Sequence, residues 1–218
     1  MHSKYDYVLF DLDGTLSASA EGIKRCIELT LHKMGKPFPD LSDYSKYIGP
    51  PLVNTFRFLC GLSEEEVSVA LRTYLEFYDT EGEHLNKLFE GTREMLEALR
   101  NTGAKLAVCS SKHQRPVLRV CEYLGITEYF DALCGSDGTP ERKEKEQIIP
   151  YSLKTLGAEG DFTAVMIGDT HFDARGARIA GVNFIGVSYG YGDRNLMKEE
   201  GAEIFAHSPE ELLRLLTE

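Results

Sequence analysis

Two carboxylates stand directly after the first apolar run of the chain. Residues 7–10 are followed by Asp11, Leu12, Asp13 and Gly14. The run predicts a buried strand, and open parallel sheets bind ligands at the carboxyl ends of their strands. Two acids at such an end concentrate negative charge, which a divalent cation with oxygen ligands would offset. Mg²⁺ is the usual choice where carboxylates handle phosphates, and the alternative interpretation is a plain Asp-Gly turn.

Hydroxyl side chains follow a second apolar run. Residues 105–109 precede Ser110 and Ser111. Ser111 and Gln114 have the spacing of a capping box, which predicts a helix N-terminus beside Ser110. Free backbone N–H groups at such an N-terminus bind anions, so we expect an anion site there.

Two further acids follow the apolar run at residues 164–167. Asp169 stands at the end of this expected strand, and Asp173 falls four residues later, one turn into a predicted helix. The two carboxylates could therefore reach the same ion. Lys145 lies on a predicted helix ahead of the same strand. Acids, a hydroxyl and a lysine thus converge on one edge of one sheet.

The apolar runs alternate with helical patterns along most of the chain. Apolar runs without alternation are typical of a parallel sheet covered on both faces. Between them lie amphipathic helical faces followed by glycine, as expected for helix-to-strand connections. These patterns predict an α/β fold, a doubly wound (Rossmann-like) parallel sheet. Strands are expected at residues 7–10, 105–109, 132–134, 164–167 and 183–187, with a short sixth at 204–205.

The stretch from Ser17 to Leu88 breaks this alternation. It contains no convincing strand, and its helical patterns are interrupted by a Gly-Pro-Pro break at residues 49–51. Ser63 and Glu66 form a capping-box pattern at the start of one helix. Because the stretch is far too long for one crossover helix, we expect an inserted all-helical cap at 17–88. Residues 1–16 and 89–218 would then form the core.

Composition excludes several classes of protein. The 218 residues include 24 Lys and Arg against 35 Asp and Glu, a formal charge of −11, whereas nonspecific nucleic-acid binding needs clustered cations. No apolar run approaches the ~18 residues of a membrane span, and the start of the chain lacks a signal-peptide pattern. Five scattered cysteines argue against a disulfide framework and a zinc knuckle. We expect a cytoplasmic monomer or homodimer that binds neither nucleic acid nor membranes.

The four polar motifs together resemble those of the haloacid dehalogenase superfamily, in the subgroup with an α-helical cap after strand one. Residues 11–15 resemble the first motif, and Ser110 occupies the Ser/Thr place of the second, which usually reads Thr-Asn. Lys145 is similar to the lysine of the third, and residues 168–173 match the fourth. The resemblance covers nearly the whole chain.

Two weaker motifs are similar to the phosphoglycolate-phosphatase-like branch. They are Gly190–Gly192 after strand five and Ile48–Leu52 in the cap. In the third-motif region Lys143 is the alternative to Lys145, and the spacing of Lys145 to Ile148 resembles the family pattern more closely.

The resemblance implies a role for each acid. Asp11 would be the nucleophile that forms an aspartyl-phosphate, and Asp13 the acid and base that serves the leaving alcohol and then the water. Mg²⁺ would be held by Asp11, the backbone carbonyl of Asp13 and Asp169, and by Asp173 either directly or through another ligand.

The same resemblance implies the groups that bind the substrate. Ser110, Ser111 and Lys145 would hold the phosphoryl group, with Lys145 offsetting its charge. The substrate would be a small phosphorylated metabolite. This reading predicts a phosphoric monoester hydrolase with Mg²⁺ as cofactor.

Other functions share some of these features. A β-phosphoglucomutase-like phosphosugar mutase shares every motif, and a nucleotidase is a second alternative. A mutase cap needs cations for a second phosphate, and Arg57 is the cap cation that we expect to point inward. A non-catalytic phosphate binder would need neither acid of the first motif. The length disfavours a receiver domain, and the general acid Asp13 disfavours a dehalogenase.

Overall fold

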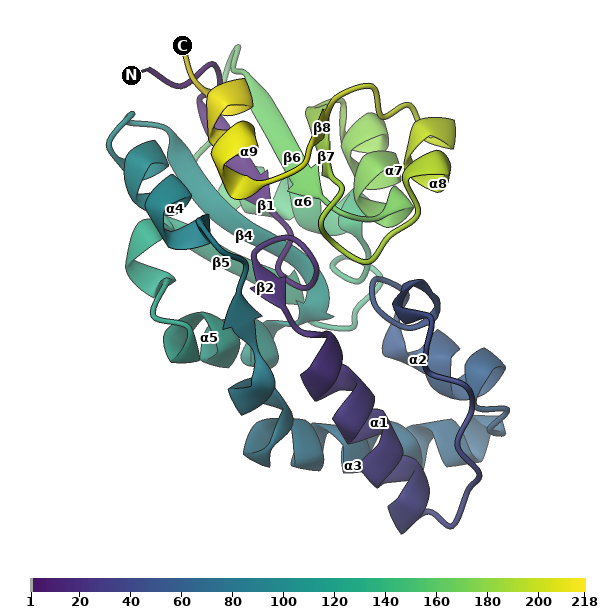
Figure 1. The fold of residues 1–218 in the computed structure, drawn as a ribbon. Coiled ribbons are helices and arrows are strands. Elements are labelled where there is room, and N and C mark those ends of the chain that lie inside the picture. The colour runs from purple at the N-terminus through teal and green to yellow at the C-terminus, as the bar shows by residue number, and fades with distance from the viewer. Residues whose placement is uncertain (1) are drawn as a thin grey trace.

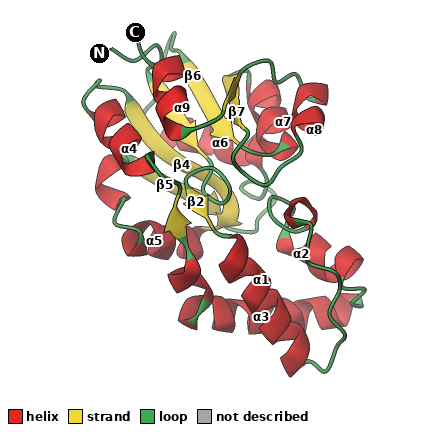
Figure 2. Cartoon of the chain, viewed as in Figure 1, coloured by secondary structure: helices red, strands yellow, loops and turns green. Residues whose placement is uncertain are grey.

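Six parallel strands form the central sheet of the protein, whose computed structural model describes residues 2–218. Their order across the sheet is β5-β4-β1-β6-β7-β8, so β1 lies between β4 and β6 (Figures 1 and 2). The predicted doubly wound α/β fold is confirmed. The strands are β1 (Tyr7–Phe10), β4 (Lys105–His113), β5 (Ala132–Ser136), β6 (Ala164–Gly168), β7 (Asn183–Val187) and β8 (Phe205–Ala206).

Helices cover both faces of this sheet, because consecutive strand residues point to opposite sides and both sides are apolar. Leu9 packs in one buried cluster with side chains of α6 and α7, whereas Phe10 belongs to a second cluster that includes side chains of α4, α5 and α9. The helices of this part are α4 (Thr92–Arg100), α5 (Gln114–Tyr123), α6 (Lys145–Thr155), α7 (His171–Ala180), α8 (Arg194–Glu199) and α9 (Pro209–Leu216), with a 3₁₀ turn at Thr127–Tyr129.

The helical segments of residues 20–85 form a second lobe beyond the carboxyl ends of the strands (Figure 1). The predicted capping box at Ser63 is confirmed, since its hydroxyl accepts from the Glu66 N–H and the Glu66 carboxylate accepts from the Ser63 N–H. Ile23 and Ile27 of α1 pack with Tyr74 of α3 in the buried cluster. The elements are α1 (Ala20–Lys33), α2 (Leu52–Asn54), a π-helical turn (Thr55–Leu59), α3 (Glu64–Thr80), and 3₁₀ turns at Tyr44–Lys46 and Gly82–Leu85.

The chain passes from one lobe to the other twice, and the two connecting segments pair with each other. β2 (Ser17–Ala18) and β3 (Lys87–Leu88) form an antiparallel pair with Ser17 opposite Leu88. The expectation of no strand from 17 to 88 is therefore wrong at both ends, because two-residue strands are too short to show a period. The Asn86 side chain fixes the junction, accepting from the Ser17 hydroxyl (2.9 Å) and donating to the Tyr78 hydroxyl (3.1 Å).

No helix within residues 2–218 is both long enough and apolar enough to cross a bilayer.

Candidate active site

Strand register brings the sequence motifs together. Phe10 pairs with Val108 of β4 on one side and with Ile167 of β6 on the other. Asp11 is the next residue along β1, and its backbone N–H donates to the Ile167 carbonyl at 2.9 Å. Ser110 and Asp169 therefore flank the end of β1, as expected for parallel strands whose carboxyl ends meet at one edge.

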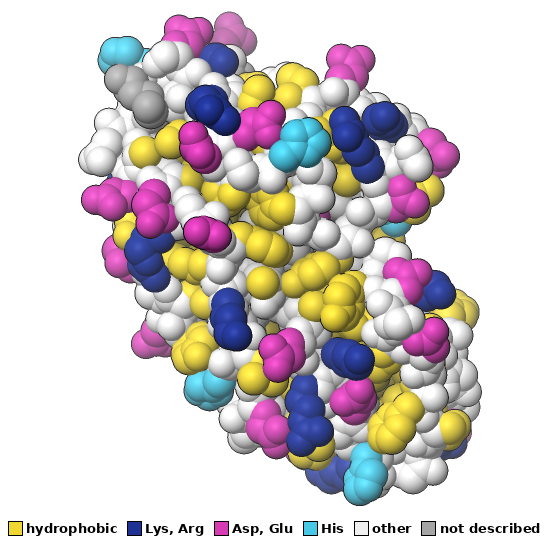
Figure 3. All heavy atoms as spheres, viewed as in Figure 1, with side chains coloured by type: hydrophobic (Ala, Val, Ile, Leu, Met, Phe, Trp, Pro, Cys, Tyr) yellow, Lys and Arg dark blue, Asp and Glu magenta, His cyan; other side chains and the backbone are white. Residues whose placement is uncertain are grey.

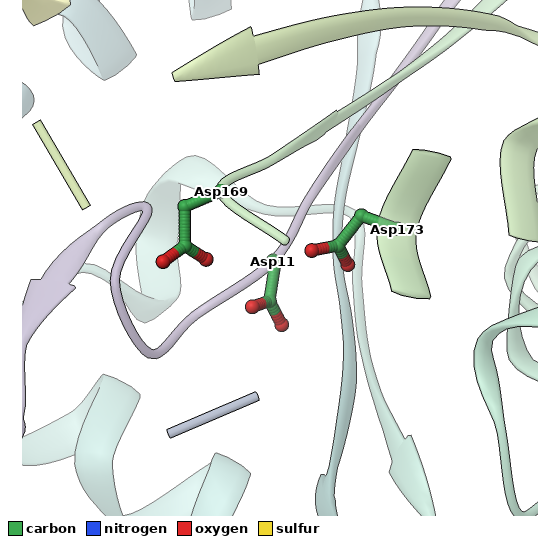
Figure 4. A group of neighbouring side chains, drawn as sticks. All are labelled: Asp11, Asp169 and Asp173. Carbon is green, nitrogen blue, oxygen red and sulfur yellow. The ribbon is translucent and has the colours of Figure 1, made fainter. Parts of the chain in front are cut away.

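Three buried carboxylates gather at this edge. Oxygens of Asp11, Asp169 and Asp173 all lie within 4.8 Å of one another, and Figure 4 shows Asp11 between the other two. Burial raises the pKa of Asp11 to about 6, although the adjacent Lys145 lowers it. Burial also raises the pKa of Asp169 well above its ordinary value, and the neighbouring carboxylates Asp11 and Asp173 raise it further.

Lys145, the first residue of α6, reaches into this group. Its Nζ lies 2.8 Å from Oδ1 of Asp11 and 2.5 Å from Oδ1 of Asp173, and it donates to the Cys109 carbonyl at 2.8 Å. Burial alone would lower the pKa of Lys145, but the two carboxylates raise it above its ordinary value. One cation thus faces three acids. By contrast, Lys143 is exposed at the rim of the adjoining cavity.

The carboxylate group fits a divalent cation. Oδ2 of Asp169 accepts the Tyr191 N–H at 2.8 Å, whereas its buried Oδ1 has no hydrogen-bond partner among residues 2–218. A buried carboxylate oxygen without a partner is costly, and a hard cation satisfies it. Gly14 makes room for this carboxylate, since a Cβ there would lie 2.2 Å from Oδ2 of Asp169, and its φ of +89° is a conformation that favours glycine.

Asp13 lies beside this group and has a different partner. Its Oδ2 accepts from Nζ of Lys112 at 2.8 Å, while its buried Oδ1 has no hydrogen-bond partner in the described part of the chain. Nζ of Lys112 also lies 4.3 Å from the ring centroid of Tyr78 on α3. Burial alone would lower the pKa of Lys112, but the Asp13 carboxylate raises it above its ordinary value. Sequence reasoning missed Lys112, although its place after Ser110 and Ser111 at a strand end was a signal.

The second motif differs from its expected local structure. β4 continues to His113 and α5 begins at Gln114, so the helix N-terminus predicted beside Ser110 is wrong. The capping box is also wrong, because the Gln114 amide instead bonds to the backbone of β5, donating to the Leu133 carbonyl and accepting the Gly135 N–H, both at 2.8 Å. Ser110 is nevertheless buried beside Asp11.

A cavity of about 420 Å³ lies between the two lobes, directly over these residues. Its floor includes Asp11, Asp13, Ser110 and Lys145, and Ser111 lines it as well. The predicted site residues are thus brought to one place, except that Asp169 lies behind the floor and does not line the cavity. Figure 3 shows hydrophobic side chains gathered across the junction of the lobes. The volume is in the range of cavities that enclose small organic ligands.

Comparisons with known proteins agree with this arrangement. The model of the haloacid dehalogenase-like hydrolase family matches residues 8–187. A 5′-nucleotidase of Pseudomonas aeruginosa is 35% identical over 206 residues, covering 94% of this chain and 90% of the relative. Phosphoglycolate phosphatase 1 of the same organism is 27% identical over 217 residues, covering 94% and 78%. The crystal structure of a predicted phosphatase from Clostridium acetobutylicum has a TM-score of 0.88 and 36% identity, and the match covers 97% of both chains.

Proposed function

Since the chain belongs to the haloacid dehalogenase-like hydrolases, we propose that it is a Mg²⁺-dependent phosphatase that hydrolyses small phosphomonoesters through an aspartyl-phosphate. One observation carries the proposal. The buried Asp11 carboxylate lies 2.8 Å from the Lys145 ammonium, within a group of three acids, at the floor of a cavity. A carboxylate placed in this way can attack phosphorus while the lysine offsets charge on the phosphoryl oxygens.

The first half of the reaction uses Asp11 and Asp13. An oxygen of Asp11 attacks phosphorus, the bond from phosphorus to the ester oxygen breaks, and an acyl phosphate forms on Asp11. Protonated Asp13 gives its proton to the departing alkoxide. Asp13 lines the same cavity, and its Oδ1, which has no hydrogen-bond partner among residues 2–218, is the oxygen proposed for this transfer. The Ser110 hydroxyl and Lys145 bind the phosphoryl oxygens.

The second half returns the enzyme to its starting state. Asp13, now a carboxylate, accepts a proton from a water molecule whose oxygen attacks the phosphorus of the acyl phosphate. The bond between phosphorus and the Asp11 oxygen breaks, which releases inorganic phosphate. Asp13 is left protonated for the next turnover, so atoms and protons balance over the cycle.

Mg²⁺ would be bound by Asp11, Asp169 and the Asp13 backbone carbonyl, with Asp173 binding it directly or through another ligand. When bound, it would neutralise charge on the acids and on the phosphoryl group. Asp173 is also held in place by its own neighbours, because its Oδ2 accepts from the Thr170 hydroxyl (2.6 Å) and N–H (3.1 Å).

The mutase alternative receives no support from the cap. Arg57, the cap cation expected to point inward, instead pairs with Glu64 at 2.6 Å and does not line the cavity. A second phosphate would therefore meet no cap cation there.

We also place the enzyme in the cytoplasm, because none of its five cysteines, all within residues 2–218, forms a disulfide.

Phosphate release from phenyl phosphate and from nucleoside 5′-monophosphates tests the proposal. Asp11→Asn should lower turnover by about 10³-fold or more, since an amide is a poor nucleophile. Asp161→Asn makes the same change at an exposed site outside the cavity and should leave turnover unaltered. EDTA should abolish activity and excess Mg²⁺ restore it. Full activity after exhaustive chelation would refute the metal requirement.

A further inference from the structure

The cap side of the cavity carries no charge. Every cap residue that lines it, from Ile23 to Tyr78, is apolar, aromatic or glycine, and they include Leu52, Val53, Leu71, Tyr74 and Leu75. All charged lining residues come from the core. Two of its tyrosine hydroxyls already have partners within the cap, where Tyr78 accepts from Asn86 and Tyr47 donates to the Leu41 carbonyl.

The cations of the core are committed to other groups. Lys145 is enclosed by Asp11 and Asp173, and Lys112 is held by Asp13 at 2.8 Å. Lys143 and His113, the remaining basic residues that line the cavity, are exposed at the rim. A second anionic group on a substrate whose phosphate lies beside Asp11 would therefore be buried against the cap without a partner. Such burial is strongly unfavourable.

Aromatic side chains form part of the same walls. Tyr74 and Tyr78 stack on each other, with ring centroids 5.6 Å apart and planes 19° apart. Phe172 of α7 lines the cavity from the core. Flat rings pack favourably against such surfaces, and apolar contact gains free energy in proportion to the area removed from water.

Building on the proposed function, we propose that the alcohol part of the substrate is uncharged and carries a flat ring, which the cap wall formed by Leu71, Tyr74 and Leu75 binds. A nucleoside and a simple aryl alcohol share this chemistry. A two-carbon acid such as glycolate lacks the ring and adds a charge, so its phosphate ester should be a poor substrate.

Substrate comparison on the intact protein tests this inference directly. With Mg²⁺, kcat/KM is measured for UMP, AMP, phenyl phosphate and phosphoglycolate. The ring-bearing esters should exceed phosphoglycolate by about tenfold or more, as expected when a pocket must bury an unpaired polar group. If kcat/KM is higher for UMP and AMP than for phenyl phosphate, the ring belongs to a nucleoside. If phenyl phosphate has the higher kcat/KM, the ring belongs to an aryl alcohol.

A charge placed on the cap wall supplies a second test. Leu75 and Val69 both lie on α3 and are similarly exposed, at 40% and 42%, but Leu75 lines the cavity and Val69 does not. Leu75→Lys should lower kcat/KM for the ring-bearing esters and raise it for phosphoglycolate, which changes their ratio by about tenfold. Val69→Lys, the matched control, should leave the ratio within about twofold.

The outcomes separate the two proposals. Phosphoglycolate as the best substrate, or equal ratios in the two lysine variants, overturns the inference and leaves the phosphatase standing. A folded protein that hydrolyses none of the four esters overturns the phosphatase itself, and the substrate class with it.

Discussion

The Lys112 ammonium lies 2.8 Å from Oδ2 of Asp13 and, on its other side, 4.3 Å from the centre of the Tyr78 ring. Lys112 therefore contacts both the proposed general acid and helix α3 of the second lobe. The side chains of Lys112 and Asp13 are 11% and 14% exposed, so solvent screens their attraction little. Lys112 is thus placed to hold Asp13 in one orientation.

Removing this charge should act on proton donation to the leaving group. Lys112→Met keeps most of the side-chain length, and we expect kcat for phenyl phosphate to fall by about 10- to 100-fold. The kcat for p-nitrophenyl phosphate, whose leaving group departs without a proton, should fall much less. Steady-state kinetics with both esters measures the difference.

Lys105→Met is the matched control for this prediction. Lys105 is 55% exposed and pairs with Asp131 outside the site. Equal losses for the two esters in Lys112→Met would show that Lys112 supports the fold and does not position Asp13.

Mg²⁺ binding should depend on pH through the buried acids. Burial raises the pKa of Asp11 from 3.8 to about 6, so between these values the folded, metal-free protein holds a proton that the unfolded chain releases. The contribution of Asp11 to stability is therefore present at low pH and is lost as the pH rises through 6. Protons compete with the metal, so added Mg²⁺ should raise Tm more at pH 7.5 than at pH 5.

Thermal unfolding in EDTA and in Mg²⁺ at the two pH values checks this prediction. Asp169→Asn should greatly reduce the rise in Tm caused by Mg²⁺ at both pH values, because it removes a buried oxygen proposed to bind the metal. Its Tm in EDTA should not fall, since an amide oxygen can still accept the Tyr191 N–H. If Mg²⁺ raised Tm by the same amount at pH 5 and pH 7.5, that result would argue against these acids as the metal site.

The junction of the lobes depends on a buried acid. Glu83 is 5% exposed and pairs with Arg119 of α5, which also donates to the Asp79 carbonyl at 2.8 Å. Arg119→Met should lower the free energy of unfolding by about 1–3 kcal/mol, because it leaves the Glu83 carboxylate buried without its partner. Urea unfolding measures the loss.

The double variant Arg119→Met with Glu83→Gln tests the cause of that loss. Neutralising the orphaned acid should recover part of the stability, since the remaining amide is less costly to bury than a carboxylate. Strict additivity of the two single changes would mean that the pair does not couple the lobes.

Features that depend on neighbouring residues could be predicted from the sequence, whereas contacts between residues far apart in the chain could not. Residues 7–10 are a continuous apolar run and residues 184–187 contain no polar side chain, and the structure has strands at 7–10 and 183–187, with the bounds expected. Lys112 could not be assigned a partner, because Asp13 is 99 residues away and its approach depends on strand register. The capping box predicted for Ser111 and Gln114 does not form, because backbone groups of β5 bind the Gln114 side chain. The roles of the site residues and the separation of 17–88 as a cap domain stay predictions.

Trapping the covalent intermediate tests the central claim most directly. The enzyme is mixed with Mg²⁺ and a phosphomonoester, quenched in acid and treated with borohydride, which reduces an aspartyl-phosphate to homoserine. Peptide mass spectrometry should then find homoserine at position 11, and at no position in Asp11→Asn. Rapid phosphate release with unmodified aspartate at position 11, or with homoserine at another aspartate, would contradict a mechanism in which Asp11 is the nucleophile.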